Sequence, residues 1–190
     1  MSEAYAFQEE TEDEMIDGKI IAMSPRPVIN HHEISINIAI IFRSYLKGKT
    51  CRAYADGVDL YLTPKDRFIP DGMVVCDKNK IKFDGVHGTP NLVIEILSPS
   101  TAKRDRGYKK DIYGKSGVQE YWLVNPADKS VEIYLSNGSE LVFNNIYTLY
   151  PDYLLEKMTD EERSKVETTF KCSLFDDLEF SLDEIFRDLL

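Results

Sequence analysis

Cysteine is scarce in this sequence: its three copies, Cys51, Cys76 and Cys172, are widely separated and form no CxxC pair. Disulfide-stapled scaffolds and structural zinc sites need paired or closely spaced cysteines, so the pattern favours ordinary thiols. Long hydrophobic runs are also missing, since no stretch approaches the roughly 20 apolar residues of a membrane helix. The N-terminus lacks the basic-then-apolar pattern of a signal peptide. We therefore expect a cytoplasmic protein with no membrane partner.

Basic residues are also fewer than acidic ones. The chain has 23 basic against 33 acidic residues, a net charge of −10, which repels a polyanion and excludes a generally basic nucleic-acid binder. One segment is different: KRDRGYKK, from Lys103 to Lys110, has five basic residues and one Asp. Any contact with nucleic acid must therefore be local, and we expect it in this cationic patch.

What remains suits one folded domain spanning residues 1–190. Apolar residues make up 43% of the chain, with 11 Tyr and 9 Phe, which is enough for a packed core. The nucleotide-binding, zinc-protease and hydrolase signatures GxGxxG, GxxxxGK[ST], HExxH and GxSxG are all absent. Candidate catalytic residues must therefore be sought outside these common motifs.

The order of the predicted elements indicates an α/β (α+β) domain around a mixed β-sheet flanked by helices. After an acidic lead-in, a strand pair around Asp17-Gly18 predicts an N-terminal β-hairpin. Ile34, Ile38 and Phe42 form part of an apolar stripe that predicts a helix from Asn30 to Gly48. Asn30 with Glu33 three residues later fits a capping box at the start of that helix.

Strand-like runs fill much of the rest of the chain. DGVDLYLTP and FIPDGMVVCD, separated by the turn-like PKDR, predict neighbouring strands, and NLVIEILS predicts a central strand covered on both faces. A helix over 104–115 precedes the buried run EYWLVNP and the hairpin of VEIYLS and ELVFNNIY. In the tail we expect a polar helix over 152–165 and a short final helix over 182–190.

Two carboxylates stand out in this pattern. Glu95 interrupts an apolar strand, where a buried charge is costly unless it is paired or metal-bound, although a strand-end Glu that reaches solvent or an Arg is an equal alternative. Asp71 opens the strand GMVVC, and an Asp before Gly is more often a turn residue. Together, on adjacent strands, they could converge on one divalent cation, because Mg²⁺ prefers oxygen ligands and retains waters.

A third element is the helix after Pro99. Asp105, Lys109 and Tyr113 recur at i, i+4 and i+8, so they share one face, which could look back at Glu95. A Lys beside a metal-bound water can orient or deprotonate it and can neutralise charge on a phosphate. Spacing alone favours the simpler interpretation, a surface ion pair between Asp105 and Lys109.

The start of the first helix offers accessory candidates. Glu33 is either the capping-box residue, which we prefer, or an extra carboxylate that reaches the metal. His32, with its neighbour His31, is most simply a polar helix-start residue, and contact of His32 with substrate is the alternative.

Set in order, Asp71, Glu95 and Lys109 make the chain resemble the Uma-two family, described as restriction endonucleases of the PD-(D/E)XK nuclease superfamily. The resemblance runs through several segments, of which the stretch from IEILSPST to GVQEYWLV is the most specific: MIDGKIIAMSPRP with the following His32 helix, IPDGMVVCD, LVIEILSPST, RDRGYKKDIY, GVQEYWLVNP and LFDDLEFSLDEIF.

The resemblance implies a restriction-endonuclease-like fold and roles for particular residues. Asp71 matches the PD half-motif and Glu95 the acidic residue of the second half, while Leu97 replaces the usual Lys two positions later. Lys109 matches the position to which that Lys has migrated in the family. Asp105 and Tyr113 match neighbouring family positions without an assigned role.

The function that this implies is a metal-dependent endonuclease acting on DNA. We expect Asp71 and Glu95 to hold Mg²⁺, or Mn²⁺ as a substitute, together with the backbone carbonyl near Ile96, while Lys109 assists the attacking water. The DNA backbone would contact four side chains of the cationic patch: Lys103, Arg104, Arg106 and Lys110. A homodimer suits cleavage of two strands.

Two alternatives stay open at this point. The first is a catalytically inactive nuclease-fold module that acts in partner binding or assembly, which the net charge of −10 and the missing Lys at position 97 favour. The second is a metal-dependent hydrolase of nucleotides or another small phosphate ester. Metal affinity separates the inactive module from both enzymes, and a substrate panel separates the enzymes from each other.

Overall fold

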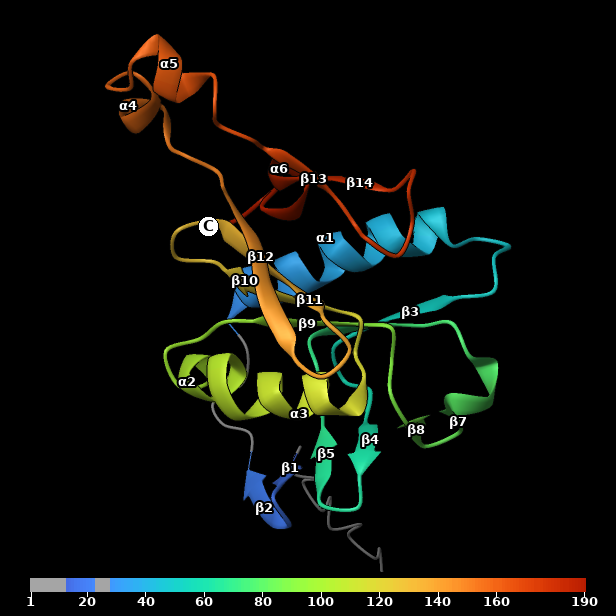
Figure 1. Cartoon of the computed structure of the whole chain (residues 1–190). Helices are drawn as coiled ribbons and strands as arrows, with labels where there is room; N and C mark the ends of the chain where they lie inside the picture. The colour runs from blue at the N-terminus through green and yellow to red at the C-terminus, as the bar shows by residue number, and fades with distance from the viewer. Residues whose placement is uncertain (1–12, 23–27) are drawn as a thin grey trace, which may run out of the picture.

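The computed structural model describes residues 13–22 and 28–190, and two six-stranded β-sheets organise it (Figure 1). The predictions for the N-terminal leader and for the end of the hairpin segment fall on residues outside these ranges. The central sheet has the order β12-β11-β10-β9-β6-β3. Its strands are β3 (Arg52–Ala55), β6 (Gly72–Val75), β9 (Leu92–Ile96), β10 (Glu120–Asn125), β11 (Ser130–Ser136) and β12 (Leu141–Thr148).

The second sheet has the order β2-β1-β5-β4-β8-β7. Its strands are β1 (Asp13–Ile16), β2 (Lys19–Ala22), β4 (Leu60–Thr63), β5 (Asp66–Phe68), β7 (Ile81–Lys82) and β8 (Gly85–His87). A small two-stranded sheet joins β13 (Thr169–Lys171) to β14 (Glu179–Ser181). The helices are α1 (Ile29–Tyr45), η1 (Lys78–Lys80), α2 (Ala102–Arg104), the π-helical η2 (Asp105–Lys109), α3 (Lys110–Ser116), α4 (Asp152–Leu155), α5 (Asp160–Arg163) and α6 (Leu182–Ile185).

Strand β9 lies in the middle of the central sheet and is buried along its whole length, as its apolar run predicts. It pairs in parallel with β10 and antiparallel with β6, so the sheet is mixed. Successive side chains of a strand point to opposite faces. Leu92, Ile94 and Ile96 therefore join the core under α1, while Val93 belongs to the core on the opposite face.

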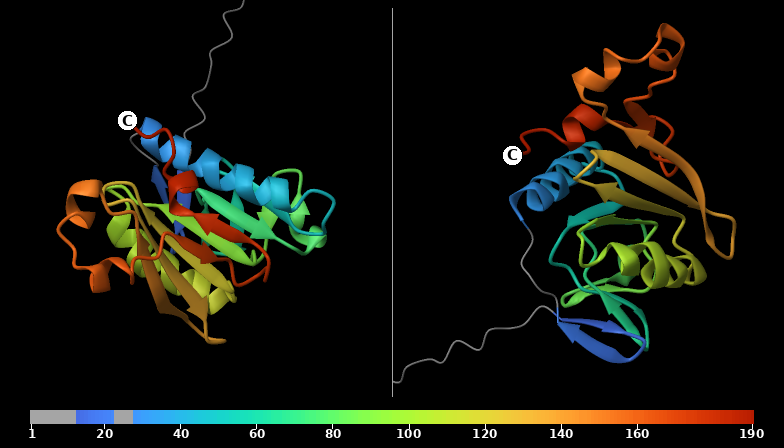
Figure 2. Two further views of the ribbon diagram at one scale, coloured as in Figure 1. Left: turned by 90° about the horizontal axis from the view of Figure 1, so that it is seen from above. Right: turned by 90° about the vertical axis from the view of Figure 1, so that its left-hand side faces the viewer.

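Helix α1 and the C-terminal segment cover one face of this sheet, and Figure 2 shows α1 and α6 side by side. Trp122 anchors this core: it is fully buried and its ring contacts those of Phe42 and Phe180. The side-chain amide of Asn37 on α1 donates hydrogen bonds to the carbonyls of Ile185 and Arg187. The end of the chain therefore holds α1 in place.

The opposite face carries one continuous helical segment, formed by α2, η2 and α3, with the second sheet beyond it (Figure 1). The hairpin β1–β2 turns at Asp17 and Gly18, both with positive φ, as the Asp-Gly pair predicts. Glycine closes the helical segment too, because Gly117 adopts the left-handed conformation at its C-terminus.

Several predicted elements differ from the observed ones. FIPDGMVVCD is divided between two sheets, because Phe68 ends β5 beside β4 whereas Gly72–Val75 pairs with β3 and β9. The polar helix predicted over 152–165 is two short helices, α4 and α5. Thr159 provides the physical reason, since it forms a capping box with Glu162 that starts a new helix.

The predicted capping box at the start of α1 is wrong. The helix begins at Ile29, so Asn30 lies inside it, and Val28 is the N-cap without a side-chain hydrogen bond. The side chain of Asn30 instead exchanges hydrogen bonds with the backbone N–H and carbonyl of Leu190. Asn30 therefore joins the first helix to the end of the chain and does not cap the helix.

The prediction of three ordinary thiols is also wrong. Cys51 and Cys76 form a disulfide, and Cys172 is a buried free thiol. The reason is the register of β3 against β6, in which Arg52 pairs with Val75. One step further along these antiparallel strands brings Cys51 opposite Cys76, across 25 residues of sequence. In the described part of the chain, no helix has the length and apolar character needed to span a membrane.

Candidate active site

Asp71 and Glu95 lie beside each other, as the sequence predicts, because β6 and β9 are neighbours. Gly72 pairs with Ile94, and one step along the antiparallel ladder aligns Asp71 with Glu95. The Asp71 carboxylate also extends the ladder, since Oδ2 accepts a hydrogen bond of 2.6 Å from the backbone N–H of Ile96. Asp71, Glu95 and Ile96, the three positions expected to hold a metal, therefore lie at the same end of the pair β6 and β9.

Glu95 is buried, with 3% of its surface exposed, so it does not reach solvent. Its Oε1 accepts hydrogen bonds from Nζ of Lys109 at 3.1 Å and from the Tyr113 hydroxyl at 2.7 Å. Both donors come from the helical segment after Pro99, so the face shared by Asp105, Lys109 and Tyr113 does look back at Glu95. The prediction that this face meets Glu95 is confirmed.

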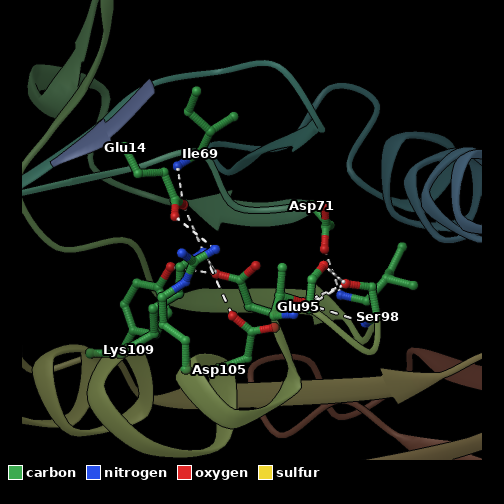
Figure 3. Close-up of polar contacts among 12 residues, drawn as sticks. Glu14, Ile69, Asp71, Glu95, Ser98, Asp105 and Lys109 are labelled. Carbon is green, nitrogen blue, oxygen red and sulfur yellow. Dashed lines mark hydrogen bonds and ion pairs between the residues drawn. The ribbon is translucent and has the colours of Figure 1, made fainter. Parts of the chain in front are cut away.

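Lys109 is at the centre of a buried charge cluster (Figure 3). Its Nζ lies 2.7 Å from Glu14 Oε1, 3.1 Å from Glu95 Oε1 and 3.8 Å from Asp105 Oδ1. The surface ion pair between Asp105 and Lys109 is therefore wrong, because both residues are almost completely buried. They belong to the π-helical η2, and π-helical turns occur often at functional sites.

Glu14 is a member of this cluster that sequence reasoning missed. It comes from β1, is fully buried, and accepts a hydrogen bond from the backbone N–H of Ile69. Its Oε2 lies 3.5 Å from the Arg104 guanidinium. Its signal was the strand alternation, since Glu14 and Ile16 are the two buried positions of β1. Glu14 was missed because it lies among other acidic residues near the N-terminus.

Burial and charge shift the titration of these groups in defined directions. Burial raises the pKa of Glu95 well above its usual range, and the Lys109 ammonium only partly opposes this. Burial likewise raises the pKa of Asp105, against the same ammonium. For Lys109, burial alone would lower the pKa, but the carboxylates of Glu95 and Glu14 outweigh it and the pKa is raised. Burial next to Glu95 raises the pKa of Tyr113, which keeps its proton for the hydrogen bond.

The histidine that reaches the site is the neighbour of the predicted one. His31 lies in the first turn of α1, with Nε2 at 3.2 Å from Asp71 Oδ1. Burial would lower the pKa of His31, but the Asp71 carboxylate outweighs it and the pKa is raised. His32 is exposed, and Glu33 is half-buried. Neither makes a hydrogen bond or ion pair with another residue that the structure describes.

The cationic patch is partly committed to internal partners. Arg104 pairs with Glu14, and Arg106 pairs with Glu132 on β11. Lys110 is half-buried, with Nζ 5.1 Å from the centre of the Tyr134 ring. Lys103 is exposed and forms no ion pair with any residue of the described ranges. Lys103 and Lys110 are therefore the members best placed to meet an external phosphate.

The donor set of the site suits a hard divalent cation. Three carboxylates, those of Glu14, Glu95 and Asp105, face two fixed cations, Lys109 and Arg104, and the Asp71 carboxylate lies nearby beside His31, which leaves an excess of negative charge. Over residues 13–22 and 28–190, however, no three His, Cys, Asp or Glu side chains converge closely enough to hold a metal ion by themselves. Figure 3 shows Asp71 apart from the carboxylates around Lys109.

Comparisons with known proteins agree with this fold. A solved structure from Anabaena variabilis ATCC 29413, described as a "putative nuclease belonging to DUF820", superposes with a TM-score of 0.61. The match has 22% sequence identity and covers 92% of this chain and 89% of that one. It supports the restriction-endonuclease-like, mixed α+β architecture predicted from the sequence.

Two proteins of Synechocystis sp. (strain ATCC 27184 / PCC 6803 / Kazusa) are similar in sequence. The "Uncharacterized protein slr1290" is 32% identical over 135 residues, 69% of this chain and 70% of its own length. The "Uncharacterized protein sll1609" is 26% identical over 129 residues, which cover 66% of this chain and 72% of its own. The Uma2 family model, described as "Putative restriction endonuclease", matches residues 2–158. The chain thus belongs to the Uma2 family, as its motifs predict.

Proposed function

We propose that the protein is a metal-dependent endonuclease that hydrolyses phosphodiester bonds of DNA, with Mg²⁺ as cofactor and Mn²⁺ as a substitute. One observation carries the proposal: Asp71, directly before β6, and Glu95 on β9 lie at the same end of two paired strands, and Lys109 donates to Glu95 from the following helix. The family description, restriction endonuclease, supports the same reaction class.

Two carboxylates and one backbone group would hold the ion: Asp71, Glu95 and the carbonyl of Ile96. Their chemistry fits, because the ligands are oxygens and the cluster has more carboxylates than cations. When bound, the metal supplies Lewis-acid stabilisation of the phosphate and lowers the pKa of its water.

The other residues of the site position charge. Lys109 is held as an ammonium between Glu14 and Glu95, where it can offset the negative charge that develops on the phosphate. Tyr113 fixes the Glu95 carboxylate through its hydroxyl. Glu14 anchors Lys109 and Arg104 together, so the N-terminal hairpin contributes to the alignment of the site.

The substrate would approach from the cationic patch. Lys103 and Lys110 would contact the DNA backbone directly, while Arg104 and Arg106 act through the positions of Glu14 and Glu132. This local charge answers the objection raised by the net charge of −10, because interactions between exposed charges are screened beyond about 10 Å at 0.1 M salt.

A cleavage assay tests the proposal. Supercoiled and linear DNA are incubated with the protein at low salt in Mg²⁺, in Mn²⁺ or in a chelator. We expect cleavage with either metal and none with the chelator, and we expect Asp71→Asn and Glu95→Gln to abolish it. Lys109→Met should reduce kcat by about 10²–10³-fold. Asp111→Asn, which removes an exposed carboxylate of the same helical segment, is the control and should cleave normally.

A non-catalytic module is the second candidate, and a specific observation favours it. Glu95 Oε1 already accepts from both Lys109 and Tyr113, and no third metal-ligating side chain joins Asp71 and Glu95 within the ranges that the structure describes. This alternative predicts a folded protein that binds neither Mg²⁺ nor Mn²⁺, and that leaves DNA and RNA intact in both metals. Cleavage that depends on Asp71 excludes it.

A further inference from the structure

We propose that the ring of Phe143 on β12 stacks on an unpaired nucleobase while Lys110 binds the phosphate beside it, so that this surface takes single-stranded DNA. The inference rests on the proposed function and narrows its substrate from DNA in general to DNA with unpaired bases. The four side chains that the sequence led us to expect at the DNA backbone are all charged, and Phe143 was not among them.

One face of β12 is apolar and uncovered. The strand forms an edge of the central sheet, and its start lies beside α3 (Figure 1). Phe143 and Ile146 have exposed fractions of 53% and 48%. Phe143 pairs with Tyr134 and Ile146 pairs with Glu132, so all four side chains point to the same face. About half of each apolar side chain is therefore open to an external partner.

The cationic patch borders this face. Lys110 Nζ lies 5.1 Å from the centre of the Tyr134 ring, and Arg106 pairs with Glu132. Exposed Lys103 belongs to the same helical segment. Proteins that bind single-stranded nucleic acid combine such cations, which contact the phosphates, with exposed aromatic rings, which stack on the bases. The charge around this face therefore favours a nucleic acid as its occupant.

A second copy of the chain fits this edge less well. Ile133 pairs with Asn145 and Tyr134 pairs with Phe143, so Asn144 is an extra residue that interrupts the ladder. Bulges of this kind bend a strand and oppose the pairing of exposed edges. The backbone of β12 is thus poorly suited to a further strand, whereas the side chains of its apolar face are free to bind a ligand.

Aromatic contacts hold the Phe143 ring and connect it to the candidate active site. The ring packs edge-to-face on Tyr134, with the two ring centres 5.7 Å apart. Tyr134 contacts Tyr121 at 6.2 Å, and Tyr121 contacts Tyr113 at 5.3 Å. The Tyr113 hydroxyl donates to Glu95. The exposed ring and the candidate carboxylate therefore lie on the same side of the central sheet.

The stacking contact requires an unpaired base. Inside a duplex, neighbouring base pairs cover both faces of each base, so a side chain reaches a face only where the nucleotide is unpaired or flipped out. Every base has a π-face, so we expect little sequence preference. Single strands should therefore bind to this surface more tightly than a duplex of the same sequence.

Binding measured without metal tests the inference. A labelled single strand and its duplex are each titrated with the full chain at low salt in a chelator. We expect wild type to bind the single strand more tightly, and Phe143→Ala to weaken that binding by roughly 10- to 100-fold with a much smaller change for the duplex. Val142→Ala is the matched control, because Val142 has a similar exposed fraction of 45% and pairs with Leu135 on the opposite face.

A tryptophan at the same position gives a direct signal of stacking. The single tryptophan of wild type, Trp122, is fully buried. Phe143→Trp adds an exposed indole, and we expect its fluorescence to be quenched when the single strand binds. Val142→Trp adds an indole on the opposite face, and its fluorescence should change little.

Three results would overturn the inference: no binding of the single strand to folded wild type, equal single-strand affinity of Phe143→Ala and Val142→Ala, or no quenching in Phe143→Trp. A wild-type dimer that Phe143→Ala dissociates, seen by light scattering, would assign the face to a second copy and overturn it as well. Binding through Phe143 by a protein that cleaves no DNA in Mg²⁺ or Mn²⁺ would instead overturn the proposed function and leave the stacking surface standing.

Discussion

Lys109 is the residue on which the buried charges of the site depend. Its ammonium lies within 3.1 Å of two carboxylate oxygens, on Glu14 and Glu95, and the pKa of Glu95 is already raised by burial. A buried carboxylate is costly unless it is paired, so the ammonium stabilises the folded chain as well as the geometry of the site.

Replacing Lys109 by Ala should therefore destabilise the fold. Loss of one partner of a buried ion pair costs about 3–5 kcal/mol, and we expect this decrease in the free energy of unfolding from urea titrations. Lys115→Ala, at an exposed position of the same helical segment, should change stability by less than about 0.5 kcal/mol. Equal stability of the two variants would contradict the buried cluster.

Whether a site residue could be identified from the sequence depended on the helix or strand that carries it. Asp71, Glu95 and Lys109 follow from a buried strand and a helical spacing, both visible in the sequence. The choice between His31 and His32 could have been made from helical phase, because His31 precedes the buried Ile34, Ser35 and Ile38 by three, four and seven positions. Strand alternation marks Glu14 as a buried position of β1, but its place in the site depends on the docking of β1 against β5.

At the scale of elements, the helical segment over 102–116, which carries Lys109 and Tyr113, approaches β12 closely. A Cβ built on Gly114 would lie 2.9 Å from the backbone N of Leu141 and 3.1 Å from Cα of Glu140. Only a glycine permits this contact without a shift of one backbone, so the helix and the start of β12 are packed at a fixed distance.

Gly114→Ala should separate these two elements. Overpacking against backbone costs typically about 1–3 kcal/mol, and a thermal unfolding scan should show that loss as a lower Tm. Gly107→Ala provides the comparison on the same segment, because its Cβ would meet nothing within 4 Å. That variant should unfold at or slightly above the wild-type temperature, and an equal loss in both would contradict the close approach.

The disulfide ties an edge strand to the element that carries Asp71. Cys51 directly precedes β3, and Cys76 directly follows β6, the strand that begins after Asp71. Replacing both cysteines by Ser should cost about 2–4 kcal/mol of unfolding free energy, through the loop that the bond closes. A reductant should destabilise wild type by a similar amount and leave the double variant unchanged. Wild type that is insensitive to the reductant would contradict the bond.

The elements that the sequence did not predict are short or divided between sheets. Strand β3 has four residues and only one fully buried side chain, so its pattern does not distinguish it from a loop. The second sheet joins strands from residue 13 to residue 87 through long-range pairs that local periodicity cannot register. The longer elements α1, β9 and β10 were predicted correctly because each has several buried positions, and the hairpin of β11 and β12 was predicted correctly from the Asn137-Gly138 turn.

For the whole molecule, the distribution of charge matters more than its sum. The acidic segment over 152–162 lies in α4 and α5, at the opposite end from the β1–β2 hairpin that contributes Glu14 (Figure 2). The cationic patch lies on the helical segment that carries Lys109. A polyanion could therefore contact the patch at a distance from this acidic segment.

Charge reversal tests this arrangement. Lys103→Glu with Lys110→Glu should weaken DNA binding and reduce the slope of log affinity against log salt by about one for each lost phosphate contact. Lys157→Glu with Lys165→Glu makes the same change in net charge near α4 and α5 and should leave binding at the wild-type level. Equal weakening by both pairs would indicate a response to total charge only.

The most direct test of the central claim is a calorimetric titration of Mg²⁺ and Mn²⁺ into wild type, Asp71→Asn and Glu95→Gln, with the fold of each protein checked on the same sample. The account predicts binding to wild type that both substitutions abolish, because Asp71 and Glu95 are the two carboxylates at the end that β6 and β9 share. Binding that survives both substitutions, or no binding to folded wild type even with DNA present, would contradict it.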